Sequence, residues 1–167
     1  MAKQRDDLER RVAALEAAVA RLTPQSAPTT EPSATADDLW ALHGLRERGI
    51  EAVLMAGSLT VPAAGQVAWQ YGLTADNLLE LDWAEFASTI DALSHPARLT
   101  IVRLVLNGVQ STAALLAQES LGTTGQLHHH LRQLVAAGWL SPVKRGEYAV
   151  PAHRVVPLLA VILAAQR

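Results

Sequence analysis

Cysteine is absent from the 167-residue chain, which excludes disulfide bonds, zinc–thiolate centres and thiol nucleophiles. Charged residues are also few, at 18%, and aromatic residues make up only 4%. The longest apolar run, residues 155–165, is about half the ~20 residues that a membrane-spanning helix needs. The N-terminus is charged between Lys3 and Arg11 and has no apolar core, so it is not a signal peptide. We therefore expect a soluble, cytoplasmic protein of one domain, or of one domain with an appendage.

A strong net charge is missing as well, since the formal charge is −2 at pH 7. The charges are unevenly divided along the chain. Residues 1–93 contain 7 Lys and Arg against 14 Asp and Glu, a balance of −7, whereas residues 94–167 contain 7 against 2, a balance of +5. Five of the six histidines also lie in the second part. A basic half on an acidic chain is a reason to look for a nucleic-acid-binding face there.

Residues 1–22 have the spacing of a short coiled coil. Apolar residues recur at intervals of 4, 3, 4 and 3, with Val at a and Leu at d, which favours parallel dimers; they are Leu8, Val12, Leu15, Val19 and Leu22. Arg11 at g and Glu16 at e can pair between chains. The alternative is an amphipathic helix that packs on its own domain. Residues 23–36 contain three prolines among Ser, Thr and Ala, which predicts a flexible linker.

Residues 37–82 are predicted to form an extension. A helix is expected over 37–48, followed by strands over 50–61 and 66–72 around a turn at 62–65. One face of this hairpin is apolar, comprising Val53, Met55, Leu59, Val61, Val67, Trp69 and Tyr71. A two-stranded hairpin is marginal alone, so it must pack on a helix or pair with a second copy. The aromatic residues of this region either line an apolar pocket or belong to the core; they are Trp40, Trp69, Tyr71 and Trp83.

Residues 83–167 are predicted to form the main domain. A capping-box pattern at 82–85 starts a helical segment with an apolar stripe at Trp83, Phe86, Ile90 and Leu93. Proline is favoured in a first helical turn, so a new helix is expected to start at Pro96, and it stops at Asn107-Gly108.

A helix-turn-helix pattern follows. It consists of a short helix over 111–119, a tight connection at 121–123 and a longer helix over 124–137 that Gly138 ends. In the short helix, the inward residues are expected to be Ala114, Leu115 and Leu116. Strands over 139–143 and 148–150, joined by a polar turn at 144–147, complete a hairpin of the kind called a wing. The expected fold is mainly α (α+β): a winged helix-turn-helix domain with an N-terminal coiled-coil helix and an extra β-hairpin.

The longer helix has two unlike faces. At 100° per residue, Leu127, Leu131 and Leu134 share one face. Gly125, Gln126, His129, Arg132 and Gln133 lie opposite, and none is acidic. Gln and Arg can contact adenine and guanine edges in the major groove, and Thr at a helix start can contact phosphate. The expected DNA contacts are Thr123, Thr124, Gln126, His129, Arg132 and Gln133, with Lys144 and Arg145 at the tip of the wing.

Two segments of this part of the chain form a recognisable set, ALSHPARL at 92–99 and TGQLHHHLRQLVAAGWL at 124–140. Together they resemble the arsenic-repressor-like (ArsR-type) winged-helix family of bacterial transcription regulators. The resemblance covers about residues 83–166. It implies operator binding by a dimer whose terminal helices form the interface. The best-known members sense metals through cysteines, which this chain lacks, so thiolate metal sensing is excluded.

The three consecutive histidines, His128 to His130, do not predict a metal site, because neighbouring helical residues point in different directions. His130 is expected to be structural. His129 is expected to contact DNA or phosphate, the alternatives being inert surface or metal ligation. The chain has no nucleophile motif, phosphate-binding glycine loop or His-Glu-x-x-His motif, so we expect neither an enzyme nor a bound cofactor.

The C-terminal segment 154–165 is apolar nearly all round, and such a helix must be buried on several sides. A subunit interface is the favoured interpretation, with Val155, Leu158, Leu159 and Ile162 as dimer contacts; a packed core helix is the alternative. We therefore expect a homodimeric, sequence-specific DNA-binding regulator without a resident metal. The alternative function is a winged-helix adaptor for protein–protein interaction, because a fold does not fix a function. The sequence identifies no small-molecule or protein effector.

Overall fold

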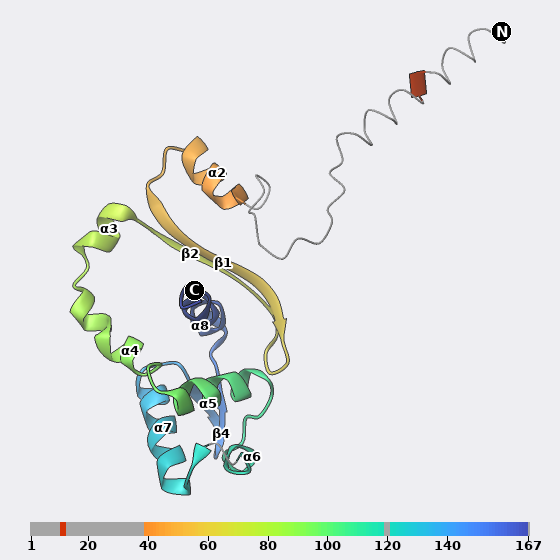
Figure 1. Ribbon diagram of the computed structural model, residues 1–167, viewed down its shortest axis with the longest axis vertical. Coiled ribbons are helices and arrows are strands. Elements are labelled where there is room, and N and C mark those ends of the chain that lie inside the picture. The colour runs from red at the N-terminus through yellow and green to blue at the C-terminus, as the bar shows by residue number, and fades with distance from the viewer. Residues whose placement is uncertain (1–10, 13–38, 119–120, 167) are drawn as a thin grey trace, which may run out of the picture. The chain divides into compact units, whose positions relative to one another are not determined.

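The computed structural model describes residues 11–12, 39–118 and 121–166 (Figure 1). Contacts divide the chain into two units, Met1–Trp40 and Ala41–Arg167. The predicted coiled coil and linker lie outside the described residues, except for Arg11 and Val12, which are helical and exposed. The coiled coil therefore stays a prediction.

The described residues combine helices with two antiparallel hairpins, in agreement with a mixed α+β class. The elements before the main domain are α2 (Trp40–Glu47), β1 (Ala52–Val61), β2 (Gly65–Thr74) and α3 (Ala75–Glu80). Those that follow are η2 (Trp83–Phe86), α4 (Ala87–Asp91), α5 (Pro96–Leu106), α6 (Thr112–Leu116), α7 (Thr124–Ala136), β3 (Ser141–Lys144), β4 (Glu147–Ala149) and α8 (Ala152–Ala164).

The predicted hairpin of the extension is confirmed, and its strands are ten residues long. β1 and β2 pair from Ala52 with Thr74 to Val61 with Gly65. The predicted apolar face is buried at the closed end, where Val61 and Val67 belong to the core. It is uncovered at the open end, where Val53 and Tyr71 are exposed.

Helix α8 covers the middle of the hairpin, in contact with both strands. The two elements approach closely at Gly57 of β1. A Cβ atom placed on this residue would lie 2.9 Å from both methyl carbons of Val156. A glycine at this position therefore lets the helix lie directly against the strand.

Replacing Gly57 with alanine is expected to lower the free energy of unfolding by about 1–3 kcal/mol, because the added methyl group forces α8 away from β1. Thermal or urea unfolding measures the change. Gly125→Ala is the matched control, because a Cβ atom there would meet nothing within 4 Å and alanine is the better helix former. Equal stability of the two variants would contradict the close contact.

A second set of contacts joins the helices of the main domain. Leu115, Leu127, Leu131 and Leu134 are almost wholly buried and share one apolar cluster with Ile101 and Val105 of α5. Trp139 closes this cluster after α7: its indole Nε1 donates to the Thr89 carbonyl at 2.8 Å, and the Arg154 guanidinium lies 5.0 Å from its ring centroid. The helices predicted over 96–106 and 124–137 are confirmed to within one residue.

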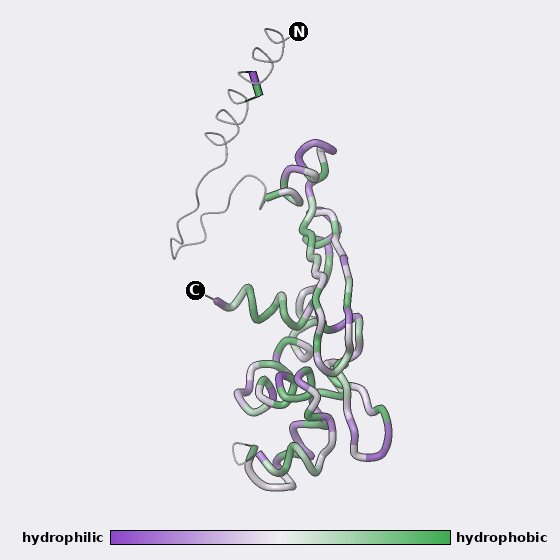
Figure 2. Tube along the Cα trace, turned by 90° about the vertical axis from the view of Figure 1, so that its right-hand side faces the viewer, coloured by the Kyte–Doolittle hydropathy of each residue, from purple (hydrophilic) through white to green (hydrophobic). Residues whose placement is uncertain are grey.

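Helix α8 is divided into a buried and an exposed half. Val155 and Leu158 are buried in the core of the chain, so they have no surface left for a partner, and their predicted role in a dimer interface is corrected to core packing. Leu159 is half-buried and Ile162 is exposed, so both keep surface for a partner. Figure 2 shows the apolar character of α8 continuing to its C-terminal end.

The segment before α5 differs from its prediction. Asp82 caps it, accepting from the Ala84 backbone N–H at 3.0 Å, but the first turn is the 3₁₀ helix η2. The apolar stripe predicted for this segment is mostly uncovered. Only Leu93 is buried, whereas Trp83, Phe86 and Ile90 are exposed. Trp40 and Tyr71 are exposed too, whereas Trp69 is half-buried and packs against the core, so of these four aromatic residues only Trp69 contributes to the core. Among the described residues, no helix has both the length and the apolarity to span a membrane.

Candidate nucleic-acid interface

Helix α6 is shorter than predicted, covering Thr112–Leu116. Ser111 caps it, and its hydroxyl accepts from the Ala114 backbone N–H at 3.1 Å. Leu115 is fully buried and Leu116 half-buried as predicted, whereas Ala114 is exposed. The helix is therefore anchored mainly through Leu115.

The connection to α7 ends in a complete capping box. Thr123 accepts from the Gln126 backbone N–H at 3.4 Å, and its own backbone N–H donates to Gln126 Oε1 at 2.8 Å. Gly122 has a φ of +75°, and a Cβ atom there would collide with the amide oxygen of Gln126. Glycine is therefore required both for the turn and for the cap, and the start of α7 is fixed by residues 122–126.

Helix α7 presents the two faces predicted from its sequence. Leu127, Leu131 and Leu134 are at most 1% exposed. Gln126, His129 and Arg132 are exposed on the other side, together with Thr123 and Thr124 at the start of the helix. The helix contains no acidic residue, so its outward surface is neutral to basic along its whole length.

Gln133 is the exception among the predicted DNA contacts. It is half-buried, and its Oε1 accepts from the Arg98 guanidinium. This corrects the placement of Gln133 on the open face: its oxygen is committed to the interior of the protein. Gln126 is exposed, but its Oε1 belongs to the capping box, so a base contact by this residue would use its amide nitrogen.

Arg98 is a buried cation that holds two parts of the domain together, a role that was not predicted from the sequence. It is 6% exposed and donates to the Ala92 carbonyl at 2.7 Å, to the Asp91 carbonyl at 2.7 Å and to Gln133. It thus ties the turn before α5 to the middle of α7. The sequence signals for this role are an arginine in the first turn of a mostly apolar helix and its place in the ALSHPARL segment at 92–99.

The second hairpin, β3–β4, follows α7 and turns at Arg145 and Gly146. Lys144 pairs with Glu147 at 3.0 Å, while Arg145 is exposed at the tip. The hairpin is joined to the start of α6, since the Tyr148 backbone N–H donates to the Gln110 carbonyl at 3.0 Å and the Thr112 N–H donates to the Gly146 carbonyl at 2.8 Å. These bonds connect the tip of the hairpin to the helix that precedes α7.

His130, in the middle of α7, packs among basic groups. Its ring centroid lies 4.7 Å from that of His95 and 5.7 Å from that of His129. Its Nδ1 is buried, with no hydrogen-bond partner among the described residues. Burial, followed by the charges of His95, Arg98 and His129, lowers the pKa of His130 below 6.5. His130 is therefore placed as the structural histidine that the sequence predicted.

The stability of the protein is expected to fall as the pH is lowered through and below about 6.5. The unfolded chain takes up a proton on His130 near that pH, while the folded chain resists protonation until the pH is lower, so protons favour unfolding. Urea unfolding between pH 7.5 and 5 measures this slope, which His130→Phe should reduce. His43→Gln, which removes an exposed histidine of α2, is the control. An unchanged slope in His130→Phe would contradict the prediction.

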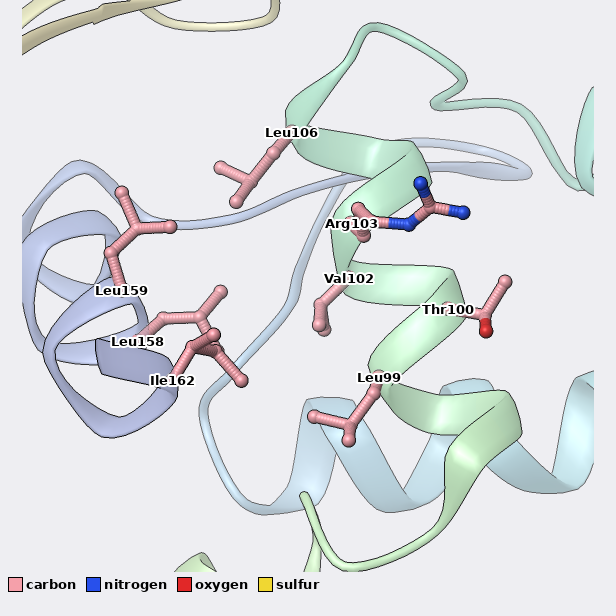
Figure 3. A pocket seen from close by; sticks show the side chains of 8 residues that line it. All are labelled: Leu99, Thr100, Val102, Arg103, Leu106, Leu158, Leu159 and Ile162. Carbon is pink, nitrogen blue, oxygen red and sulfur yellow. The ribbon is translucent and has the colours of Figure 1, made fainter. Parts of the chain in front are cut away.

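An apolar cavity of about 280 Å³ lies between α5 and α8. Figure 3 shows Leu106 and Leu99 of α5 pointing towards Leu159 and Ile162 of α8 across it. Leu159 and Ile162, the predicted dimer contacts of α8 that keep free surface, thus border this cavity.

Across the described residues, no cluster of three His, Cys, Asp or Glu side chains has the geometry to hold a metal ion. Comparison of the chain with protein-family models, with curated proteins and with solved structures gave no match.

Proposed function

We propose that the chain is a winged helix-turn-helix transcription regulator, similar to the arsenic-repressor-like family, that binds duplex DNA as a homodimer. In this proposal α6 and α7 are the helix-turn-helix, α7 is the recognition helix in the major groove, and β3–β4 is the wing. The resemblance of the motifs at 92–99 and 124–140 to that family supports the assignment.

The outward face of α7 is the observation that carries the proposal. Arg132, His129 and Gln126 are exposed on it, and no carboxylate lies on the helix to repel phosphate. An arginine on a major-groove helix can donate two hydrogen bonds to one guanine, the most common specific contact in protein–DNA complexes. Arg132 is therefore the proposed base-reading residue. Thr123, Thr124 and His129 are proposed to hold the phosphate backbone.

The second hairpin supports the same orientation. Its hydrogen bonds to residues 110–112 hold the tip beside the start of α6, and Arg145 is exposed there. We assign Arg145 to a phosphate or the minor groove next to the site of α7. Lys144 adds less, because Glu147 already neutralises part of its charge.

A homodimer would place two copies of α7 on one duplex, and a two-fold protein reads a palindromic operator. Leu159 and Ile162 beside the α5–α8 cavity are the α8 contacts that remain available. The seam at Leu8, Val12, Leu15, Val19 and Leu22 would add a parallel coiled coil.

The test is binding of the purified full chain to fragmented genomic DNA, followed by titration of a captured duplex at several salt concentrations. Four phosphate contacts would lower the affinity about 100-fold between ~50 and ~200 mM salt. A scrambled duplex of equal length is the control for specificity. No duplex binding even at ~50 mM salt would overturn the proposal and favour the protein-interaction adaptor.

A further inference from the structure

A patch of apolar side chains outside the proposed DNA interface is left uncovered in the single chain. We define the apolar shelf as Tyr71, Leu81, Trp83, Phe86 and Ile90, which are 41–65% exposed. Tyr71, Leu81 and Phe86 line one open hollow. Trp83, Phe86 and Ile90 are spaced three and four residues apart, which places them on one side of a helical segment.

The shelf is held in place rather than loosely exposed. The Trp83 indole Nε1 donates to the Leu78 carbonyl at 2.8 Å, so the polar atom of the side chain is satisfied and the ring remains free for contact. Asp82 caps the turn that carries it, and α3 contacts β2. A pre-ordered tryptophan is a common centre of a protein interface.

The C-terminal end of α8 is also apolar and exposed, like the shelf. The end of α8 exposes Val161, Ile162 and Leu163 at 44%, 39% and 67%, and residues 155–165 contain no charge. The buried half of α8 already packs on the hairpin at Gly57, which pairs with Trp69, two residues before the shelf residue Tyr71. Packing of α8 against this sheet is therefore a contact that the chain already forms.

We propose that the shelf receives the exposed end of α8 from a second copy of this chain, with the reciprocal insertion forming the other half of a two-fold interface. The inference deepens the homodimer of the proposed function and rests on it. A two-fold interface needs the projecting and the receiving surface on the same chain, and this chain has both.

Charge and area support a second copy as the occupant. The segment of the shelf carries Glu80, Asp82 and Glu85, and no Lys or Arg occurs between residues 49 and 97, so nucleic acid and anionic lipid would be repelled. The eight side chains of the shelf and the α8 end, each about half exposed, present on the order of 700 Å² per chain. This is close to the roughly 800 Å² that each partner contributes to a standard interface.

The absence of native cysteine makes a direct test available. Two differently tagged full-length chains are co-expressed, one with Leu163→Cys and the other with Ile90→Cys or Trp83→Cys, and are treated with a short bismaleimide. The expected result is a mixed cross-link carrying both tags. Leu163→Cys paired with Val143→Cys is the control, because Val143 is 64% exposed but lies on β3. A yield for both shelf positions no higher than the Val143 yield would overturn the insertion.

A second measurement tests the energetic contribution. Ile90→Asp is expected to raise the dimer dissociation constant at least about tenfold in sedimentation equilibrium, with Val143→Asp unchanged. Circular dichroism verifies that both variants are folded. Equal dissociation constants would overturn the proposal. A mixed cross-link in a protein that does not bind duplex DNA would support the interface and contradict the proposed DNA function. Dimeric DNA binding without the cross-link would support the DNA function and contradict the interface.

Discussion

Replacing Arg98 with alanine is expected to lower the free energy of unfolding by about 3 kcal/mol or more, since it leaves two interior acceptors without a donor. They are the carbonyl of Ala92 and the amide oxygen of Gln133, whereas the Asp91 carbonyl keeps the backbone N–H and the hydroxyl of Ser94 as donors. Each buried group left without a partner costs about 1–3 kcal/mol. For a domain of this size, the expected decrease in melting temperature is on the order of 10 °C.

Two variants distinguish the loss of these buried hydrogen bonds from the loss of a positive charge. Arg98→Lys keeps the charge but loses the planar set of donors, so it should recover only part of the stability. Arg103→Ala removes an exposed arginine of the same helix and should change the stability by less than about 0.5 kcal/mol. A loss below about 1 kcal/mol in Arg98→Ala would show that the buried bonds contribute little.

Replacing Arg132 with alanine is expected to lower the affinity for the operator about 100-fold or more without destabilising the fold. Arg132 is exposed on α7, so its removal leaves no buried group unpaired. A bidentate contact to a base contributes about 1–3 kcal/mol, and a homodimer makes it twice. Fluorescence anisotropy with the captured duplex measures the loss, and thermal unfolding verifies the fold.

Arg46→Ala is the matched control for Arg132→Ala, because it removes one exposed arginine from α2 rather than from α7. It should change the affinity for the operator less than about twofold. Gln126→Ala is a poorer probe, since it also removes half of the capping box. If Arg132→Ala and Arg46→Ala bind equally well, α7 is not the recognition helix.

The features that sequence analysis predicted well depend on local patterns. The β1–β2 hairpin follows from alternating apolar residues on either side of a turn that begins with Pro62 and ends with Gly65, and α7 follows from its leucine spacing and from Gly138, which ends it. These signals arise from residues within a few positions of one another, where periodicity and capping chemistry are decisive.

The features that it missed depend on residues far apart in the chain. The bond between Arg98 and Gln133 spans 35 positions, and nothing near Gln133 distinguishes it from its exposed neighbours on α7. Burial of Val155 and exposure of Ile90 are equally non-local. An apolar stripe has the same pattern whether it faces its own core or a partner.

The contact between Gly57 and Val156 has a consequence for the order of folding. A shift of the hairpin by one residue would place Ser58 or Ala56 beneath α8 and reverse every side chain of that strand, so the helix selects the pairing. Val156 is made about 100 residues after Gly57. During synthesis the hairpin is therefore without the surface that fixes its register until about 100 further residues have emerged. Throughout that interval, its two uncharged strands must remain unpaired with the exposed strand edges of other chains.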